Sequence, residues 1–173
     1  LGIVLPLKAA TVRRQASACL EALPGWANTV VGDLLSELHH LDERIAQYDK
    51  HIQAIARDDE RAKQLMRLSG VGPTTATALL AMIGNGHEFR CGRQFAAWLG
   101  LTPGQYSSGG KTRLGRITKA GDAYLRTLLI LGARAVLAAA KNKAGSVSRW
   151  ATALEQRRGY WKAVVAIAAK NAR

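Results

Sequence analysis

Two adjacent serines, Ser107 and Ser108, stand at the part of the sequence best suited to chemistry. Gly109 and Gly110 follow them directly, and four cations come next, Lys111, Arg113, Arg116 and Lys119. A serine oxygen that attacks a phosphodiester must lose its proton, and the negative charge that develops must be stabilised, which nearby cations can do. The same composition also suits a basic loop that only contacts phosphates through hydroxyls and amides. Both interpretations stay open on composition alone.

A second glycine-centred turn lies at Gly70-Val71-Gly72, followed by Pro73, Thr74 and Thr75. Pro73 fits the first turn of a helix, and backbone N–H groups at a helix N-terminus favour phosphate. Residues 65–83 resemble a helix-hairpin-helix, a sequence-independent nucleic-acid-binding motif, with Ala76 where a small residue lets two helices cross closely. The alternative is a helix–helix turn used only for packing.

The net charge of +13 is unevenly distributed along the chain. Residues 1–60 contain nine acidic and six basic side chains, whereas residues 61–173 contain three acidic and nineteen basic ones. A localised excess of cations is typical of a polyanion binder. We therefore expect nucleic acid as the partner of the second region, the alternatives being a solubilising surface or an acidic protein.

The sequence offers no metal or redox site. Cys19 and Cys91 have no metal-binding or redox spacing, His39, His40 and His51 lack partners, and no acidic cluster in the basic region could hold Mg²⁺. No run approaches the roughly 18 apolar residues of a membrane span, so we expect no membrane segment. The start at Leu1 suggests a piece cut from something longer.

Residues 28–60 show the clearest periodicity. Apolar side chains recur at alternating spacings of three and four, at Val31, Leu34, Leu38, Leu41, Ile45, Tyr48, Ile52 and Ile55. This heptad seam predicts a long helix, with Asn28 or Thr29 as its cap, that pairs between chains or packs against another helix of the same chain. Pairing between chains would make the protein a homo-oligomer, a dimer or tetramer.

The rest of the chain predicts a mainly α fold. We expect a short remnant or linker at 1–27, the coiled-coil helix at 28–60 and a compact helical domain at 61–173. Within that domain the Gly/Ser-rich stretch 104–121 reads as a basic loop that contains at most short strands. The predicted helices cover 61–68, 73–83, 95–99, 123–141, 148–158 and 160–170, with Asp122 as an N-cap.

A few aromatic and basic residues outside the two turns have simpler interpretations. Tyr124 could stack on a base or belong to the core, and we favour the core. Tyr160-Trp161-Lys162 is expected to anchor the packing of the terminal helix. Arg126 and Arg134 lie eight residues apart on one helix face, where they could line a cleft or be solvated. We count Arg126 among the candidate nucleic-acid contacts, with Gly70, Val71, Gly72, Thr74, Thr75, Lys111, Arg113, Arg116 and Lys119.

The order of these features resembles a known family. The heptad helix leads to Gly-Val-Gly-Pro-Thr-Thr-Ala, then to Gln94–Pro103, Ser107–Lys111, Gly115–Asp122 and Leu125–Leu129. This order closely resembles the C-terminal part of the DEDD-type bacterial insertion-sequence transposases, RNA-guided serine recombinases that act on DNA in the bacterial cytoplasm, associated with the nucleoid.

The resemblance implies a division of labour. A RuvC-like N-terminal domain with four acidic residues would bind Mg²⁺ and lies outside this chain. The C-terminal domain would supply a serine that becomes covalently linked to DNA, carried here onto Ser108, with Ser107 as runner-up. The site would be composite between protomers and would work with a guide RNA, so this chain alone should bind nucleic acid without completing strand exchange. The alternative is a non-catalytic helix-hairpin-helix module for nucleic-acid binding and oligomerisation.

Overall fold

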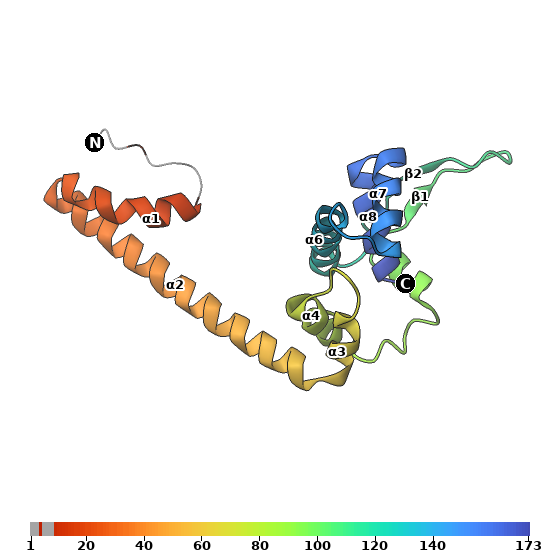
Figure 1. Cartoon of the computed structure of the whole chain (residues 1–173), viewed down its shortest axis with the longest axis horizontal. Helices are drawn as coiled ribbons and strands as arrows, with labels where there is room; N and C mark the ends of the chain where they lie inside the picture. The colour runs from red at the N-terminus through yellow and green to blue at the C-terminus, as the bar shows by residue number, and fades with distance from the viewer. Residues whose placement is uncertain (1–3, 5–8) are drawn as a thin grey trace. The chain divides into compact units, whose positions relative to one another are not determined.

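The protein is described here by a computed structural model that covers residue 4 and residues 9–173 (Figure 1). The chain divides into two compact units, Leu1–His51 and Ile52–Arg173. Both are built mainly from helices, and the described residues contain one small two-stranded sheet. The expectation of a mainly α fold is therefore confirmed.

The first unit is a pair of helices. Helix α1 (Ala9–Cys19) ends in a single 3₁₀ turn, and α2 (Gly25–Asp58) begins directly after Pro24. The Arg13 guanidinium makes two hydrogen bonds, of 2.6 and 2.8 Å, to the Asp42 carboxylate, which ties α1 alongside α2 (Figure 1). Helix α1 also contributes the buried Ala16 to this unit.

The start of α2 differs from the expected one. The helix begins at Gly25, so Asn28 and Thr29 lie inside its first turns rather than at its cap. The Asn28 side-chain amide donates to the Leu20 carbonyl (2.8 Å), and the Thr29 hydroxyl donates to the Gly25 carbonyl (3.1 Å). The prediction that one of them caps the helix is wrong, because each side chain bonds a carbonyl instead of the free N–H groups that a cap must satisfy.

The apolar seam of α2 is only partly covered within its unit. Val31 and Leu38 are half-buried, whereas Leu34, Ile45 and Tyr48 expose 65%, 58% and 60% of their surface. Monomeric soluble proteins rarely expose a contiguous run of large apolar side chains of this kind. The choice between pairing within and between chains stays a prediction.

The second unit has its core around one helix. Helix α6 (Ala123–Ala140) packs against α4 (Pro73–Ile83), α7 (Ser146–Arg158) and α8 (Tyr160–Asn171). Its buried residues recur every three or four positions, at Leu125, Leu129, Ala133, Leu137 and Ala140, as expected for one face of a helix. Asp122 caps this helix by accepting the Leu125 N–H at 2.6 Å, which confirms the predicted cap.

The length and composition of α6 would also allow it to cross a membrane, with a mean hydropathy of 1.5 over 18 residues. The sequence reading had found no such segment. The helix is instead the central packing element of its unit, and its charged residues Arg126 and Arg134 bond to protein groups. A core helix passes the same test of hydropathy as a membrane span.

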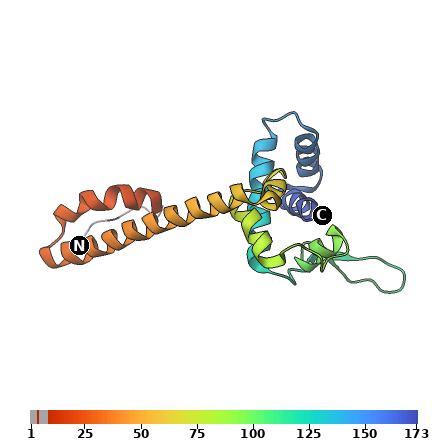
Figure 2. The same cartoon turned by 90° about the horizontal axis from the view of Figure 1, so that it is seen from below.

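The remaining elements of this unit are short. They are α3 (Glu60–Met66), α5 (Gly92–Trp98), β1 (Pro103–Gln105) and β2 (Leu114–Ile117). The two strands pair antiparallel in a ribbon that projects away from the helices, as both views show (Figures 1 and 2). A small cluster of Ala56, Ala62, Val71 and Ala76 packs α3 and α4 beside the end of α2.

Candidate nucleic-acid interface

The two serines lie on a β-hairpin, which the sequence had predicted as a loop with at most short strands. Beyond the paired strands, the Tyr106 N–H donates to the Arg113 carbonyl (2.8 Å), and the Lys111 N–H donates to the Ser108 carbonyl (3.1 Å). Gly109 and Gly110 form the two-residue turn with φ of +57° and +77°. Positive φ at both central residues marks the type I′ turn that matches strand twist, and glycine adopts it without strain.

Ser108 is the last residue before that turn, so the hairpin presents it at its tip. It is exposed, and within the described residues its hydroxyl makes no side-chain hydrogen bond. The neighbouring Ser107 differs, because its hydroxyl accepts a 2.8 Å hydrogen bond from the side-chain amide of Gln105, two residues earlier. Of the two candidates, Ser108 has the freer oxygen.

The four cations predicted near the serines lie on the second half of the hairpin, on and around β2. Lys111, Arg113, Arg116 and Lys119 are all exposed, and within the described part of the chain none of them pairs with a carboxylate. Unpaired cations at this density leave a strong positive potential around the ribbon. The hairpin can therefore attract a phosphate backbone and stabilise charge on it.

The base of the hairpin is fixed by backbone contacts with the end of α5. The Lys119 N–H donates to the Gly100 carbonyl (3.1 Å), and Lys119 itself has a φ of +56°, which is rare for a residue with a side chain. Gly121 lies so close to Trp98 that a β-carbon would collide with its carbonyl oxygen. These contacts hold the direction in which the ribbon leaves the helices.

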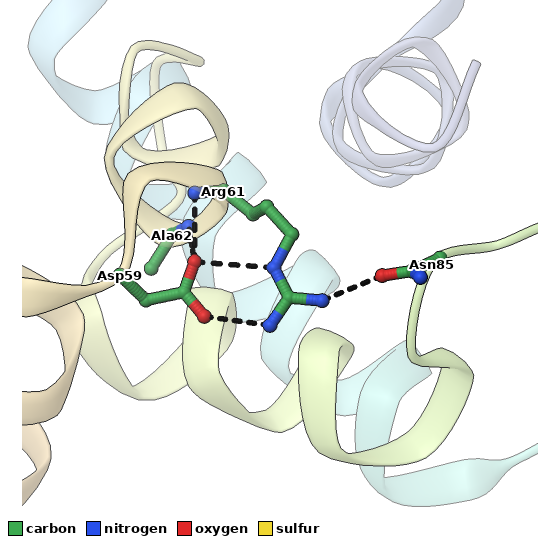
Figure 3. Close-up of polar contacts among 4 residues, drawn as sticks. All are labelled: Asp59, Arg61, Ala62 and Asn85. Atoms are coloured by element: carbon green, nitrogen blue, oxygen red, sulfur yellow. Dashed lines mark hydrogen bonds and ion pairs between the residues drawn. The ribbon is translucent and has the colours of Figure 1, made fainter.

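The predicted helix pair around the first glycine turn is present as α3 and α4. The far end of the pair is clamped by Arg61, whose guanidinium donates to the Asp59 carboxylate (2.8 and 3.2 Å) and to the Asn85 side chain (2.6 Å) (Figure 3). Asp59 also caps α3 by accepting the N–H groups of Arg61 and Ala62. The hydrogen bond from Arg61 lowers the pKa of Asp59 from 3.8 to about 2.

The candidate residues of the turn fall into two groups, those that pack against the protein and those that stay free to bind an anion. Val71 is buried, and its N–H donates to the Leu68 carbonyl (3.0 Å). Gly70, at φ +88°, lies against Gly132 of α6, where a β-carbon would be 2.7 Å from the Gly132 carbonyl oxygen. These two residues of the turn therefore contact the protein's own fold.

The N-terminus of α4 provides the groups that remain free for an anion. Gly72 stands at the N-cap position without a capping side chain, and Pro73 has no N–H. The N–H groups of Thr74 and Thr75 then have no helical partner, as at any helix start. The exposed Thr74 adds a hydroxyl, whereas the side chain of Thr75 is buried.

Arg126 is engaged inside the protein. Its Nη1 atom donates to the carbonyl oxygens of Leu99 and Gly121, both at 3.0 Å, and to that of Asp122 at 3.4 Å. A cation at the end of α5 is favoured by the free carbonyl groups there. Arg134 contacts different groups from Arg126, since its guanidinium contacts the Tyr160 hydroxyl and the Trp161 ring.

Two aromatic residues that the sequence assigned to packing are exposed. Tyr124, expected in the core, exposes 57% of its surface, and Trp161, expected as a packing anchor, exposes 64%. Both interpretations are wrong, because Leu125 and Ala163, their neighbours on the buried helix faces, fill the core instead. Trp161, exposed beside the Arg134 guanidinium, is a candidate site residue that the sequence did not indicate.

In the part of the chain that the structure describes, no three His, Cys, Asp or Glu side chains gather as a metal site. The two cysteines, Cys19 and Cys91, are free thiols, as expected. Metal chemistry, where the reaction uses it, has no donor set among these residues.

Residues 62–148, which include the helix pair, the hairpin and α6, match the sequence profile of the IS116/IS110/IS902 transposase family. The chain belongs to this family. Both glycine turns and both candidate serines lie within the matched region. The match covers the second unit from α3 to the start of α7.

Curated relatives agree with the family assignment. A probable family 20 transposase of Pseudomonas aeruginosa is 50% identical over 151 residues, which are 87% of this chain and 45% of that protein. The transposase for insertion sequence element IS1111A of Coxiella burnetii is 44% identical over 83% of this chain and 39% of its own length. The transposase for insertion sequence element IS1328 of Yersinia enterocolitica is 33% identical over 86% of this chain and 45% of its own length. The chain spans less than half the length of these relatives.

Proposed function

We propose that this chain is the DNA-binding and strand-transferring part of an insertion-sequence transposase, with Ser108 as the nucleophile. The observation that carries the proposal is the position of Ser108, exposed at the tip of a hairpin whose cations are unpaired among the described residues. Ser107 is the second candidate, because it stands on the same ribbon with its hydroxyl bonded to Gln105.

The reaction would proceed by displacement at phosphorus. The Ser108 oxygen attacks a DNA phosphodiester, an Oγ–P bond forms, and the P–O bond to one side of the cut strand breaks. The serine proton passes to a base and the departing oxygen takes up a proton, so that a phosphoserine joins protein to one DNA end. Attack by the hydroxyl that ends another strand reverses these steps and joins new partners.

The hairpin supports the charge changes of this reaction but not its proton transfers. Lys111, Arg113 and Arg116 can stabilise the charge on the phosphate oxygens as the bonds exchange. Among the described residues, no carboxylate or histidine makes a hydrogen bond to Ser108. The base therefore belongs to another part of the assembly, which fits the Mg²⁺-binding acidic domain that the family resemblance places outside this chain. We expect the isolated chain to bind DNA without completing strand exchange.

The partners follow from the same proposal. DNA is the substrate and a guide RNA selects it. The seam of the 28–60 segment brings protomers together, so that the hairpin of one protomer meets the acidic domain of another. Such an assembly works in the bacterial cytoplasm at the nucleoid. The exposed apolar side chains of α2 support the oligomer.

One observation favours a second function. The start of α4 and the unpaired cations of the hairpin can hold phosphates whether or not a serine reacts. The domain would then be a non-catalytic module for nucleic-acid binding and oligomerisation, and metal-activated water would cut the DNA elsewhere.

Trapping the covalent intermediate distinguishes the two functions. The full-length transposase is incubated with guide RNA, donor and target DNA and quenched in denaturant, and the linked residue is mapped by mass spectrometry. We expect an adduct at Ser108 that Ser108→Ala abolishes, whereas Ser107→Ala, the matched control, retains it. An adduct at Ser107 would move the nucleophile by one residue. Normal recombination by Ser108→Ala would overturn the nucleophile, and the binding module would remain.

A further inference from the structure

A groove of about 1080 Å³ opens beside the base of the hairpin, slightly larger than the roughly 300–1,000 Å³ typical of ligand sites. Strand β2 lines it together with α5, α8 and the segment between α5 and β1. Its apolar lining includes Leu101, Leu114, Ile117, Val165 and Ala166. A hollow lined in this way favours a flat, largely apolar group over bulk water.

The polar part of the lining is cationic. Arg93, Arg116, Lys119, Lys162 and Arg173 line the groove, and no Asp or Glu side chain does. Within the described residues none of the five pairs with an acidic side chain. An apolar lining among cations fits a ligand that combines an apolar plate with negative charge.

Trp161 supplies an aromatic surface in the same groove. Trp161 exposes 64% of its surface, and the Arg134 guanidinium lies 5.9 Å from the centroid of its ring. Tyr160 meets the ring edge to face, with centroids 5.2 Å apart. A supported, exposed indole is a platform on which a nucleobase can stack.

The groove adjoins a second hollow, of about 740 Å³, at the end of α8. The two share Arg93 and Arg173, and the second adds Lys170. The cations therefore continue from the apolar groove into the second hollow. A charged track beside an aromatic platform is the arrangement by which proteins hold single strands.

We propose that this groove binds an unpaired segment of the DNA strand that the hairpin engages, with a base stacked on Trp161 and phosphates on the surrounding cations. The inference rests on the proposed function, because β2 lines the groove and also leads to Ser108. Paired bases in a duplex are stacked on one another and cannot reach an apolar lining. The site therefore selects DNA whose strands have been separated.

Binding by this chain tests the groove without any strand cutting. Fluorescence anisotropy is measured with a labelled single-stranded DNA of about 15 nucleotides, within the size range of known single-strand sites. The duplex of the same sequence and the corresponding RNA serve as competing probes. We expect the single-stranded DNA to bind most tightly, and Trp161→Ala to weaken it roughly 5- to 150-fold. Trp161→Phe, which keeps a ring, should recover most of the affinity.

Trp150 provides the matched control. It is also exposed, at 38%, and also has a cation, Lys170, over its ring at 5.2 Å, but it does not line the groove. Because Trp150 contacts the cation track only through Lys170 among the described residues, we expect Trp150→Ala to weaken single-strand binding far less than Trp161→Ala does. Equal losses from Trp150→Ala and Trp161→Ala, or equal affinity for single strand and duplex, would overturn the proposal. Tighter binding of the RNA would overturn the assignment to DNA.

Ser108→Ala separates this inference from the proposed function. The variant should lose far less affinity for the single strand than Trp161→Ala does, since the serine hydroxyl lies at the hairpin tip and does not line the groove. A covalent adduct at Ser108 combined with no effect of Trp161→Ala would overturn the groove alone. Selective loss of single-strand binding in Trp161→Ala without any serine adduct would support the groove and overturn the nucleophile.

Discussion

Gly70 of the first glycine turn and Gly132 of α6 lie backbone against backbone. A β-carbon on Gly132 would collide with the Gly70 carbonyl oxygen, and one on Gly70 would be 2.7 Å from the Gly132 carbonyl oxygen. Asn171 strengthens this junction by donating to the Ser69 carbonyl at 2.8 Å. The turn that resembles a nucleic-acid-binding hairpin is therefore docked on the core helix of its unit.

Gly132→Ala should destabilise the second unit. The added methyl group meets backbone, which cannot rotate away, so α6 and the turn must separate at a cost of about 1–3 kcal/mol. Thermal unfolding checks this, with Gly32→Ala as the control. Gly32 is also inside a helix but has open space around it, so alanine there should stabilise by about 0.5–1 kcal/mol. Equal effects of both substitutions would show that the close approach does not matter.

Arg126→Ala should lower stability before it affects binding. The substitution removes three hydrogen bonds to carbonyls that join α5, the segment before α6 and α6 itself. Bonds of a charged donor contribute about 1.5–3 kcal/mol, so we expect a loss of that order in denaturant unfolding. Arg134→Ala, on the same helix but exposed, should cost less. Unchanged stability of Arg126→Ala with weakened DNA binding would instead make Arg126 a nucleic-acid contact.

Stability at the junction of α2 and α3 should fall in acid through Asp59. The pKa of Asp59 is about 2 in the folded protein, below its ordinary 3.8, chiefly because Arg61 bonds the charged carboxylate. A lowered folded pKa gives stability that is complete above the unfolded value and lost as pH falls from about 4 toward 2.

Melting temperatures at several pH values across this range test the role of Asp59. Asp59→Asn should be less stable than the parent at neutral pH, and the difference should shrink toward pH 2. Asp58→Asn removes a neighbouring carboxylate that makes no hydrogen bond to Arg61 and should leave the pH dependence in place. A constant difference between Asp59→Asn and the parent at every pH would contradict the role of the ionised carboxylate.

We expect pairing between chains to depend on the apolar seam of α2. Aspartate at Leu41 and Ile45, which are 42% and 58% exposed, puts charges where a second helix would bury apolar side chains. We expect the double variant to have a lower mass in analytical ultracentrifugation. His40→Asp with Gln47→Asp adds the same charges to exposed positions outside the seam and should leave the mass unchanged. A parent mass equal to one chain would contradict pairing between chains.

Local signals in the sequence were sufficient for most helices. The period of 28–60, Pro73 after a glycine turn and Asp122 before α6 each act within one or two turns of the chain, so they predict helices with errors of a few residues. They failed at the start of α2, because Asn28 and Thr29 look like caps but bond carbonyls within reach. The sequence also indicated membership of a transposase family, because the motifs of that family are continuous stretches of the chain.

The sequence by itself determined the mainly α fold, the basic second unit and the two glycine turns, because periodicity, charge and glycine content need no distant partner. The tertiary structure decided which groups remain free to act. Strand pairing placed Ser108 at a hairpin tip, docking on α6 used the Gly70 side of the first turn, and three carbonyls from separate segments engaged Arg126. Packing of α8 on α6 buried Ala163 and Ile167 and left Trp161 exposed beside the groove. Each of these outcomes depends on contacts between residues far apart in the chain, which no local pattern specifies.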